Sequence, residues 1–313
     1  MLYLYFVLGL FLLGFGGDTL VKGAVGVANK LKISPLVVGI VLVGFGTSTP
    51  ELMASILAAM QTPPAPGIAV GNVVGSNICN ILLVLGVTAL ISPVKLDMKN
   101  FFRDSLFLVI SSVALVIAVL CGVLNFFGGV IFVALLCGYI YYCYYLERQN
   151  KKALKDMQKE MSELAPTKGS VLKHVLITLA GIAMTMLGAK LLVDSSIVIA
   201  RQFGISETVI GLTLVAVGTS LPELATSVMA SIRKQNDVAY GNIVGSNIYN
   251  ALFILGVVAI LTPLYFPADV WESLLVMCMT TLWLITLGIF KQISRPMGVL
   301  FLLAYAGYVV CLM

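Results

Sequence analysis

Two glutamates, Glu51 and Glu223, lie near the middle of long apolar stretches in this chain of 313 residues. A charged side chain at the centre of a membrane helix costs roughly 2.5–3.5 kcal/mol on insertion scales, so it usually marks a functional site. Each glutamate follows a proline, which lacks a backbone N–H and opens the helix one turn upstream. We therefore expect free backbone carbonyls around positions 44–48 and 216–220, where they could act as ligands.

Hydroxyl side chains lie three and four residues before each glutamate, on the same face of a helix. These are Thr47 and Ser48 in one case and Thr219 and Ser220 in the other. Two more polar pairs, each spaced four residues apart, follow in the next apolar stretches: Ser76 with Asn80, and Ser246 with Asn250. The donor set is all oxygen, without His or Cys, which suits hard cations such as Ca²⁺ or Na⁺. One divalent ion, two monovalent ions or two protons would neutralise both carboxylates, so either ion type could occupy one shared site.

Other polar residues permit a structural interpretation. Close helix packing through the neighbouring glycines explains four asparagines as well as ion contact does: Asn72, Asn77, Asn242 and Asn247. Two oppositely charged pairs, each spaced four residues apart, are best explained as ion pairs within one helix: Asp18 with Lys22, and Lys190 with Asp194.

The composition is that of a membrane protein. Hydrophobic residues make up 60% of the chain and charged residues 11%, and the mean hydropathy is +1.05. A soluble domain carries about 25% charged residues. The net charge of +5 does not indicate nucleic-acid binding, because no basic cluster lies on a soluble domain. We also expect no enzymatic activity, since neither a nucleophile–base pair nor an HExxH motif accompanies the two acids.

Hydropathy, glycines, prolines and charges predict an all-α integral membrane protein with ten spans. The expected limits are 2–29, 34–61, 67–91, 104–121, 124–147, 173–202, 205–231, 236–262, 268–290 and 295–313. With both termini outside, 16 of the 19 Lys and Arg residues fall on the cytoplasmic side, including Arg103 in the loop after the third span. That distribution follows the positive-inside rule.

An internal repeat divides the chain. SPLVVGIVLVGFGTSTPELMAS, from Ser34, matches SETVIGLTLVAVGTSLPELATS, from Ser206, and GNVVGSNICNILLVLGV matches GNIVGSNIYNALFILGV. We therefore expect two five-helix repeats, 1–147 with its motif at 34–91 and 174–313 with its motif at 206–263, joined by a charged cytoplasmic connector at 148–173. Because five is odd, the second repeat enters the membrane from the opposite side. Inverted repeats of this kind place a transporter's substrate site near the midplane, where interrupted helices meet.

The paired motifs GTSxPE and GNxxGSN resemble the alpha repeats of the sodium/calcium exchanger family. The resemblance covers both repeats and, through the span count, nearly the whole chain. It implies that Ca²⁺ is held by Glu51 and Glu223, with Thr47 and Thr219 beside them. It also implies that further ligands line the Ca²⁺ and Na⁺ sites: Ser48, Ser76, Asn80, Ser220, Ser246, and the carbonyls of Gly44 and Ala216. Asn250 occupies a position where prokaryotic and potassium-dependent members often have Asp, which argues against potassium dependence.

The sequence thus predicts a sodium/calcium antiporter that works by alternating access, with the first and sixth spans sliding across a core that holds the ions. A calcium/proton antiporter is the alternative, in which Glu51 and Glu223 take up protons as Ca²⁺ leaves. An ion channel would lack dependence on a counter-ion. We expect a multi-pass protein of a prokaryotic plasma membrane, with no cofactor and no obligate protein partner. The coupling ratio stays open.

Overall fold

The computed structural model describes residues 2–33, 35–60, 66–149, 169–203, 216–266 and 270–312. In these residues all regular structure is helical except for four strands of two residues each. Seven of the described helices are long and apolar enough to span a membrane, and the bent pair 39–47 and 49–60 makes an eighth. Shorter apolar helices at 221–232 and 295–311 occupy the two remaining predicted spans. The prediction of an all-α membrane protein is confirmed.

The elements follow the predicted spans closely. The first half contains α1 (Leu2–Leu31), α2 (Pro35–Val38), the π-helical η1 (Gly39–Gly44), α3 (Phe45–Thr47), α4 (Thr49–Met60), α5 (Pro66–Cys79), the π-helical η2 (Asn80–Val84), α6 (Leu85–Ile91), β1 (Val94–Lys95), α7 (Met98–Leu120), β2 (Val123–Leu124) and α8 (Phe126–Gln149). The second half contains α10 (Val171–Gln202), α12 (Ala216–Gly218), α13 (Leu221–Ile232), α14 (Asn236–Ile248), the π-helical η4 (Tyr249–Ile254), α15 (Leu255–Leu261), β3 (Leu264–Tyr265), α16 (Val270–Leu287), the 3₁₀-helical η5 (Gly288–Phe290), β4 (Gln292–Ile293) and α17 (Arg295–Leu312). Most of the predicted connector 148–173 and part of the predicted span 205–231 lie outside the described residues.

The four short strands report the internal symmetry. β1 pairs antiparallel with β4, and β2 pairs antiparallel with β3. β1 and β3 both follow the third span of their half, whereas β2 and β4 both precede the fifth. Each pair therefore joins one half to the other, and exchanging the halves turns one pair into the other, as a two-fold relation between the repeats requires.

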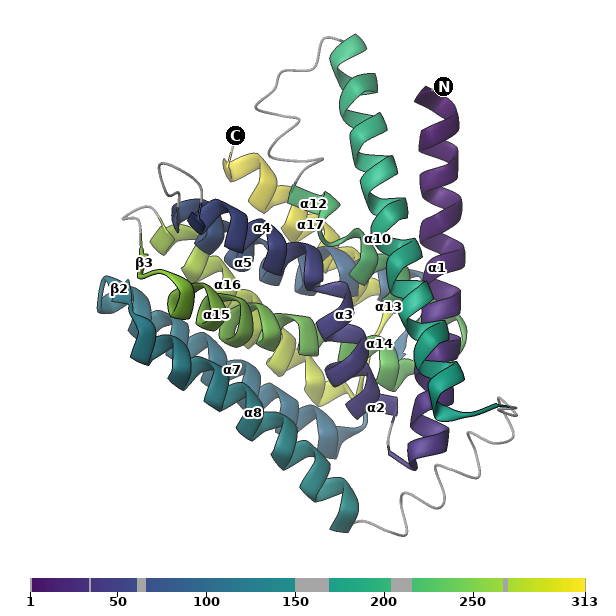
Figure 1. Ribbon diagram of the computed structural model, residues 1–313, viewed down its shortest axis with the longest axis horizontal. Helices are drawn as coiled ribbons and strands as arrows, with labels where there is room; N and C mark the ends of the chain where they lie inside the picture. The colour runs from purple at the N-terminus through teal and green to yellow at the C-terminus, as the bar shows by residue number, and fades with distance from the viewer. Residues whose placement is uncertain are drawn as a thin grey trace.

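Two long helices, α1 and α10, lie side by side along one flank of the molecule, with α7 and α8 along the opposite flank (Figure 1). Glycines let α1 and α10 approach closely: a Cβ on Gly181 would lie 2.4 Å from the backbone nitrogen of Leu20, and one on Gly188 would lie 2.7 Å from that of Leu13. Small residues bring membrane helices into backbone contact in this way. α1 and α10 therefore pack closely against each other along their length.

Two continuous segments form the interior. In the most apolar 18-residue stretch of α5–η2–α6, 72% of the residues are buried, and in that of α14–η4–α15 the share is 83%. The corresponding share is only 33% in α1 and in α10. Each segment changes from α- to π-helical hydrogen bonding at Asn80 or Tyr249. π-helical turns inside α-helices frequently mark functional sites. The two halves share this geometry, which brings both polar GNxxGSN segments into the interior of the molecule.

The loop assignment of Arg103 is wrong. Helix α7 begins at Met98, six residues before the predicted span, and Arg103 lies within it, 9% exposed. Its Nε lies 2.7 Å from Oδ1 of Asp104, which also accepts a hydrogen bond from the hydroxyl of Tyr139 at 3.0 Å. A neighbouring carboxylate allows this guanidinium to be buried, because the pair carries no net charge.

Candidate functional site

The GTSxPE segments form the helix breaks that the prolines predict. In the first half the helix bends by 49° between residues 39–47 and 49–60. The break falls at Ser48, whose φ and ψ of −83° and 8° leave the helical range, and Ser220 has nearly the same angles, −87° and 4°. Pro50 and Pro222 cannot donate to the carbonyls four residues earlier, which removes a hydrogen bond at each break.

The carboxylate of Glu223 accepts hydrogen bonds from hydroxyl groups of both halves. Its Oε1 accepts a hydrogen bond from the Ser48 hydroxyl at 3.2 Å, across the two repeats, and one from the Ser246 hydroxyl at 3.5 Å. Glu223 is 1% exposed, and its Oε2 has no hydrogen-bond partner among the described residues. The expected meeting of the two halves at this glutamate is therefore present.

Glu51 lies in the matching place in the first half. Its side chain is fully buried, it lies close enough to Glu223 for their charges to interact, and Thr219 approaches it. Neither carboxylate oxygen of Glu51 has a hydrogen-bond partner within bonding distance in the described part of the chain. A buried carboxylate with both oxygens free is costly unless a cation or a proton compensates it.

The remaining predicted side chains are buried, with the exception of Thr219. Exposed fractions are 0–3% for Thr47, Ser48, Ser76, Asn80, Ser220, Ser246 and Asn250. Thr219 is half-buried. Among these predicted side chains, three further oxygen atoms are buried without a hydrogen-bond partner in the described residues: Oδ1 of Asn80, Oγ of Ser220 and Oδ1 of Asn250.

The two predicted carbonyl ligands belong to Gly44 and Ala216. Gly44 packs against the next segment of the other half, since a Cβ on it would lie 3.3 Å from the Ser246 nitrogen. Its carbonyl already accepts the Ser48 N–H at 3.0 Å, with the Thr47 hydroxyl at 3.4 Å, so it is less free than the proline argument predicts. Ala216 begins α12.

Two asparagines support the glutamates in a way that the sequence argument left open. The Asn72 amide donates to the Glu51 carbonyl at 3.0 Å and to the Ser55 hydroxyl at 2.9 Å. The Asn242 amide does the same for the Glu223 carbonyl at 3.3 Å and for Ser227 at 2.9 Å. The sequence contains a signal for these contacts, because a serine lies four residues after each glutamate, Ser55 after Glu51 and Ser227 after Glu223.

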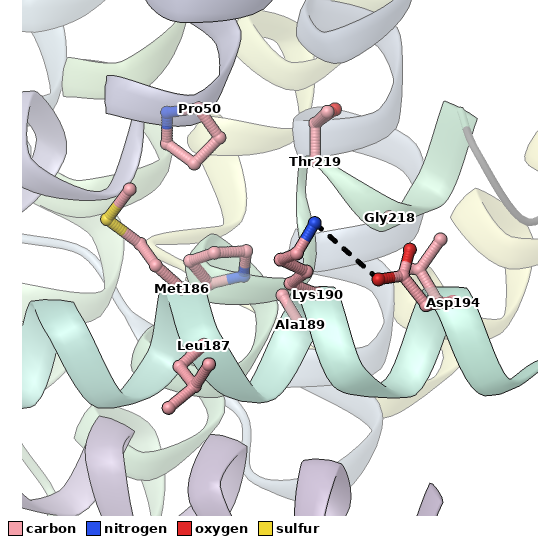
Figure 2. Close-up of a pocket in the computed structure, with 10 residues that line it drawn as sticks. Pro50, Met186, Leu187, Ala189, Lys190, Asp194, Gly218 and Thr219 are labelled. Carbon is pink, nitrogen blue, oxygen red and sulfur yellow. Dashed lines mark ion pairs between the residues drawn. The ribbon is translucent and has the colours of Figure 1, made fainter. Parts of the chain in front are cut away.

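A cavity of about 400 Å³ lies beside the site, between α10 and the two breaks. Pro50, Thr219 and Pro222 line one side of it. Lys190 and Asp194 of α10 line the other and form an ion pair 3.6 Å long (Figure 2). The predicted pairing within one helix is confirmed here and for Lys22 with Asp18, 2.7 Å apart.

Comparisons with known proteins agree with this geometry. Residues 1–145 and 173–313 match the model of the sodium/calcium exchanger protein family. The sodium/calcium exchanger MaX1 of Methanosarcina acetivorans is 34% identical over 99% of this chain and 98% of its own length. The inner membrane protein YrbG of Escherichia coli is 34% identical over 82% of this chain and 79% of its own length.

A solved structure of the sodium-calcium exchanger NCX_Mj, soaked with Na⁺ and Ca²⁺, superposes with a TM-score of 0.80 at 32% identity. The match covers 99% of this chain and 97% of that one. With nearly its full length matched in sequence and in fold, this chain belongs to the sodium/calcium exchanger protein family.

Proposed function

We propose that this chain is an antiporter that expels Ca²⁺ in exchange for Na⁺ by alternating access at a site between its two repeats. The observation that supports this most strongly is the buried pair Glu51 and Glu223, one from each half, among oxygen atoms that have no partner in the described residues. Carboxylate, hydroxyl and amide oxygens are the ligands that Ca²⁺ and Na⁺ prefer. MaX1 and NCX_Mj are named as exchangers of these two ions.

Each residue has a role in this proposal. Glu51 and Glu223 bind Ca²⁺ directly, with the hydroxyls of Thr47 and Thr219 near them. The remaining ligands contribute neutral oxygens around the Ca²⁺ and Na⁺ positions: Ser48, Ser76, Asn80, Ser220, Ser246, Asn250, and the carbonyls of Gly44 and Ala216. Because the carboxylates are buried, a site with no cation or proton is unfavourable, and bound ions are exchanged by competition rather than by release alone.

The helices around the site suggest how it is reached. The cavity beside Thr219 lies along the middle of α10 and towards its C-terminal end. With the basic loops in the cytoplasm, that end faces outside, so we assign the cavity as the external route to the site. Movement of α1 and α10 together across the core would close it and open the opposite side, and the breaks at Ser48 and Ser220 stay with the core.

The charge distribution supports a plasma-membrane protein with both termini outside. YrbG, which is similar over most of the chain, is named as an inner membrane protein. A prokaryotic inner membrane is therefore the location that we propose.

Transport by the purified protein tests this proposal. In Na⁺-loaded proteoliposomes, uptake of radiolabelled Ca²⁺ should require an outward Na⁺ gradient and should saturate with external Ca²⁺. Uptake that ignores Na⁺ and follows a pH gradient would instead establish the calcium/proton antiporter. Uptake that needs neither gradient would establish a channel.

A further inference from the structure

Two buried asparagines join the repeats at the centre of the molecule. The Asn77 amide donates to the backbone carbonyl of Asn247 at 3.2 Å, and the Asn247 amide donates to the carbonyl of Asn77 at 3.2 Å. Both residues are at most 3% exposed. The two bonds are equivalent under exchange of the halves, so this contact lies on the two-fold axis between α5 and α14. The Asn77 amide also contacts the sulfur of Met277 at 3.7 Å.

Asn77 and Asn247 lie three and two residues before the π-helical segments η2 and η4. The contact therefore lies just before the place where each interior segment changes from α- to π-helical hydrogen bonding. Buried carbonyls are rarely left without a partner, and each of these two accepts a hydrogen bond from the side-chain amide of the other residue.

Asn247 makes a third bond, and this one reaches the ion site. Its Oδ1 accepts a hydrogen bond from the Asn80 amide nitrogen at 3.0 Å. Asn80 is fully buried, and its other end, Oδ1, has no partner in the described chain. An amide can present either an oxygen or an NH₂ group, and only the oxygen binds a cation. The bond to Asn247 therefore determines which end of Asn80 is free.

We propose that Asn247 is a positioning residue, which orients Asn80 so that its oxygen faces the transported cation. The exchange of bonds with Asn77 fixes Asn247 in the place that this requires. The inference rests on the proposed function, since it needs a cation at Asn80. It assigns to Asn247 a role in ion affinity, beyond holding two helices together.

The second half lacks the corresponding bond. By symmetry, Asn250 should donate to Oδ1 of Asn77, yet in the described residues that oxygen and both polar side-chain atoms of Asn250 have no hydrogen-bond partner. Asn77 thus shares the backbone contact with Asn247 but does not orient a ligand. This difference supplies a matched control, because Asn77→Ala and Asn247→Ala each remove one amide-to-carbonyl bond across the axis, and only Asn247→Ala also removes the bond that holds Asn80.

Affinity can be measured without turnover, because a ligand that binds the folded state raises the melting temperature by an amount that grows with the logarithm of its concentration relative to Kd. We would record melting temperature against Ca²⁺ and against Na⁺ for purified wild type, Asn247→Ala, Asn77→Ala, Asn80→Ala and the double variant Asn80→Ala/Asn247→Ala. Both single changes at the axis should lower the ion-free melting temperature. Asn247→Ala should weaken ion affinity about tenfold, the effect of roughly 1.4 kcal/mol, and Asn77→Ala should weaken it far less.

The double variant decides whether Asn247 acts through Asn80. Asn80→Ala/Asn247→Ala should bind ions as weakly as Asn80→Ala alone. Additive losses, or equal losses in Asn247→Ala and Asn77→Ala, would overturn the proposal and leave Asn247 with a packing role only.

Asn247→Asp covers the case in which Asn247→Ala does not fold. It keeps the oxygen that holds Asn80 and loses the donor to Asn77, so it should retain wild-type ion affinity or better. Affinity as poor as that of Asn80→Ala would count against the proposal. If the wild type showed no stabilisation by either ion, the proposed function itself would fail, and this inference with it.

Discussion

At the scale of single residues, Asn72 and Asn242 make the same two bonds in the two halves but differ in burial. Asn242 is fully buried and Asn72 is half-buried. Asn242 also has its Oδ1 3.1 Å from the Thr47 hydroxyl, a contact between the halves. A change at either position frees a glutamate carbonyl and a serine hydroxyl, but water can reach only the less buried one.

Asn242→Ala should therefore lower the free energy of unfolding more than Asn72→Ala does. Leaving a buried polar group without its partner costs about 1–3 kcal/mol, so we expect a loss in this range for Asn242→Ala and a smaller loss for Asn72→Ala. Thermal unfolding of the purified variants in detergent measures the difference. Equal losses in the two variants would mean that the greater burial of Asn242 does not make its hydrogen bonds more important for stability than those of Asn72.

At the scale of helices, the ion pair of Arg103 with Asp104 joins α7 to α8 through Tyr139. Removing one partner of a buried pair costs about 3–5 kcal/mol, because the other charge is left uncompensated. Asp104→Asn should lower the melting temperature sharply. The second half offers a control in Glu272→Gln, since Glu272 precedes a serine near the start of α16 as Asp104 does near the start of α7, but is exposed. Its effect should stay within about 0.5 kcal/mol.

A second ion pair links α1 to the core. Asp18 of α1 pairs with Lys22 and also with Arg233, which follows α13. At the offset that relates the two motifs, the first-half position matching Arg233 is Gln61, which is uncharged. The corresponding positions, Lys190 and Gln61, therefore cannot form an ion pair with each other. In the proposed orientation this contact lies on the cytoplasmic side, where it would hold that side closed.

Arg233→Gln should favour opening at the cytoplasmic side and closure of the external cavity. Partly exposed pairs contribute about 0–1 kcal/mol, so the balance between the two states should change up to about fivefold. With Met186→Cys as a reporter in the cavity, the rate of labelling by an external, membrane-impermeant thiol reagent should fall. Lys22→Gln leaves the link between α1 and α13 intact and should have a smaller effect. Equal rates in the two variants would show that Arg233 does not control access.

The sequence located the helices and both breaks because their causes are local. A proline removes one hydrogen bond wherever it occurs, and Pro50 and Pro222 each lie two residues after the break that they predict. The contact of Ser48 with Glu223 required the fold, since no local pattern states which side chain of one half meets the other. The error at Arg103 has the opposite cause: a basic residue near a span end is typical of a loop, but Asp104, the next residue, neutralises Arg103 and lets it be buried within α7.

At the scale of the whole molecule, the paired strands and the paired asparagines both relate one half to the other by a two-fold axis. In the proposed topology, two inverted halves of five spans each put the two ends of the chain on the same side of the membrane. A fusion of alkaline phosphatase to the C-terminus should therefore be active outside the cytoplasm, and a fluorescent protein at the same place, exported unfolded, should be dark. The reverse result would contradict an even number of spans with the basic loops inside.

The central claim is that Glu51 and Glu223 form one site in which Na⁺ and Ca²⁺ compete. Equilibrium binding of radiolabelled Ca²⁺ to the purified protein, titrated with Na⁺, tests it most directly. We expect Na⁺ to displace the bound Ca²⁺ fully, and Glu51→Gln and Glu223→Gln each to abolish Ca²⁺ binding, while Glu272→Gln leaves it unchanged. Ca²⁺ that stays bound at saturating Na⁺, or that still binds tightly to either glutamine variant, would contradict a shared site between the repeats.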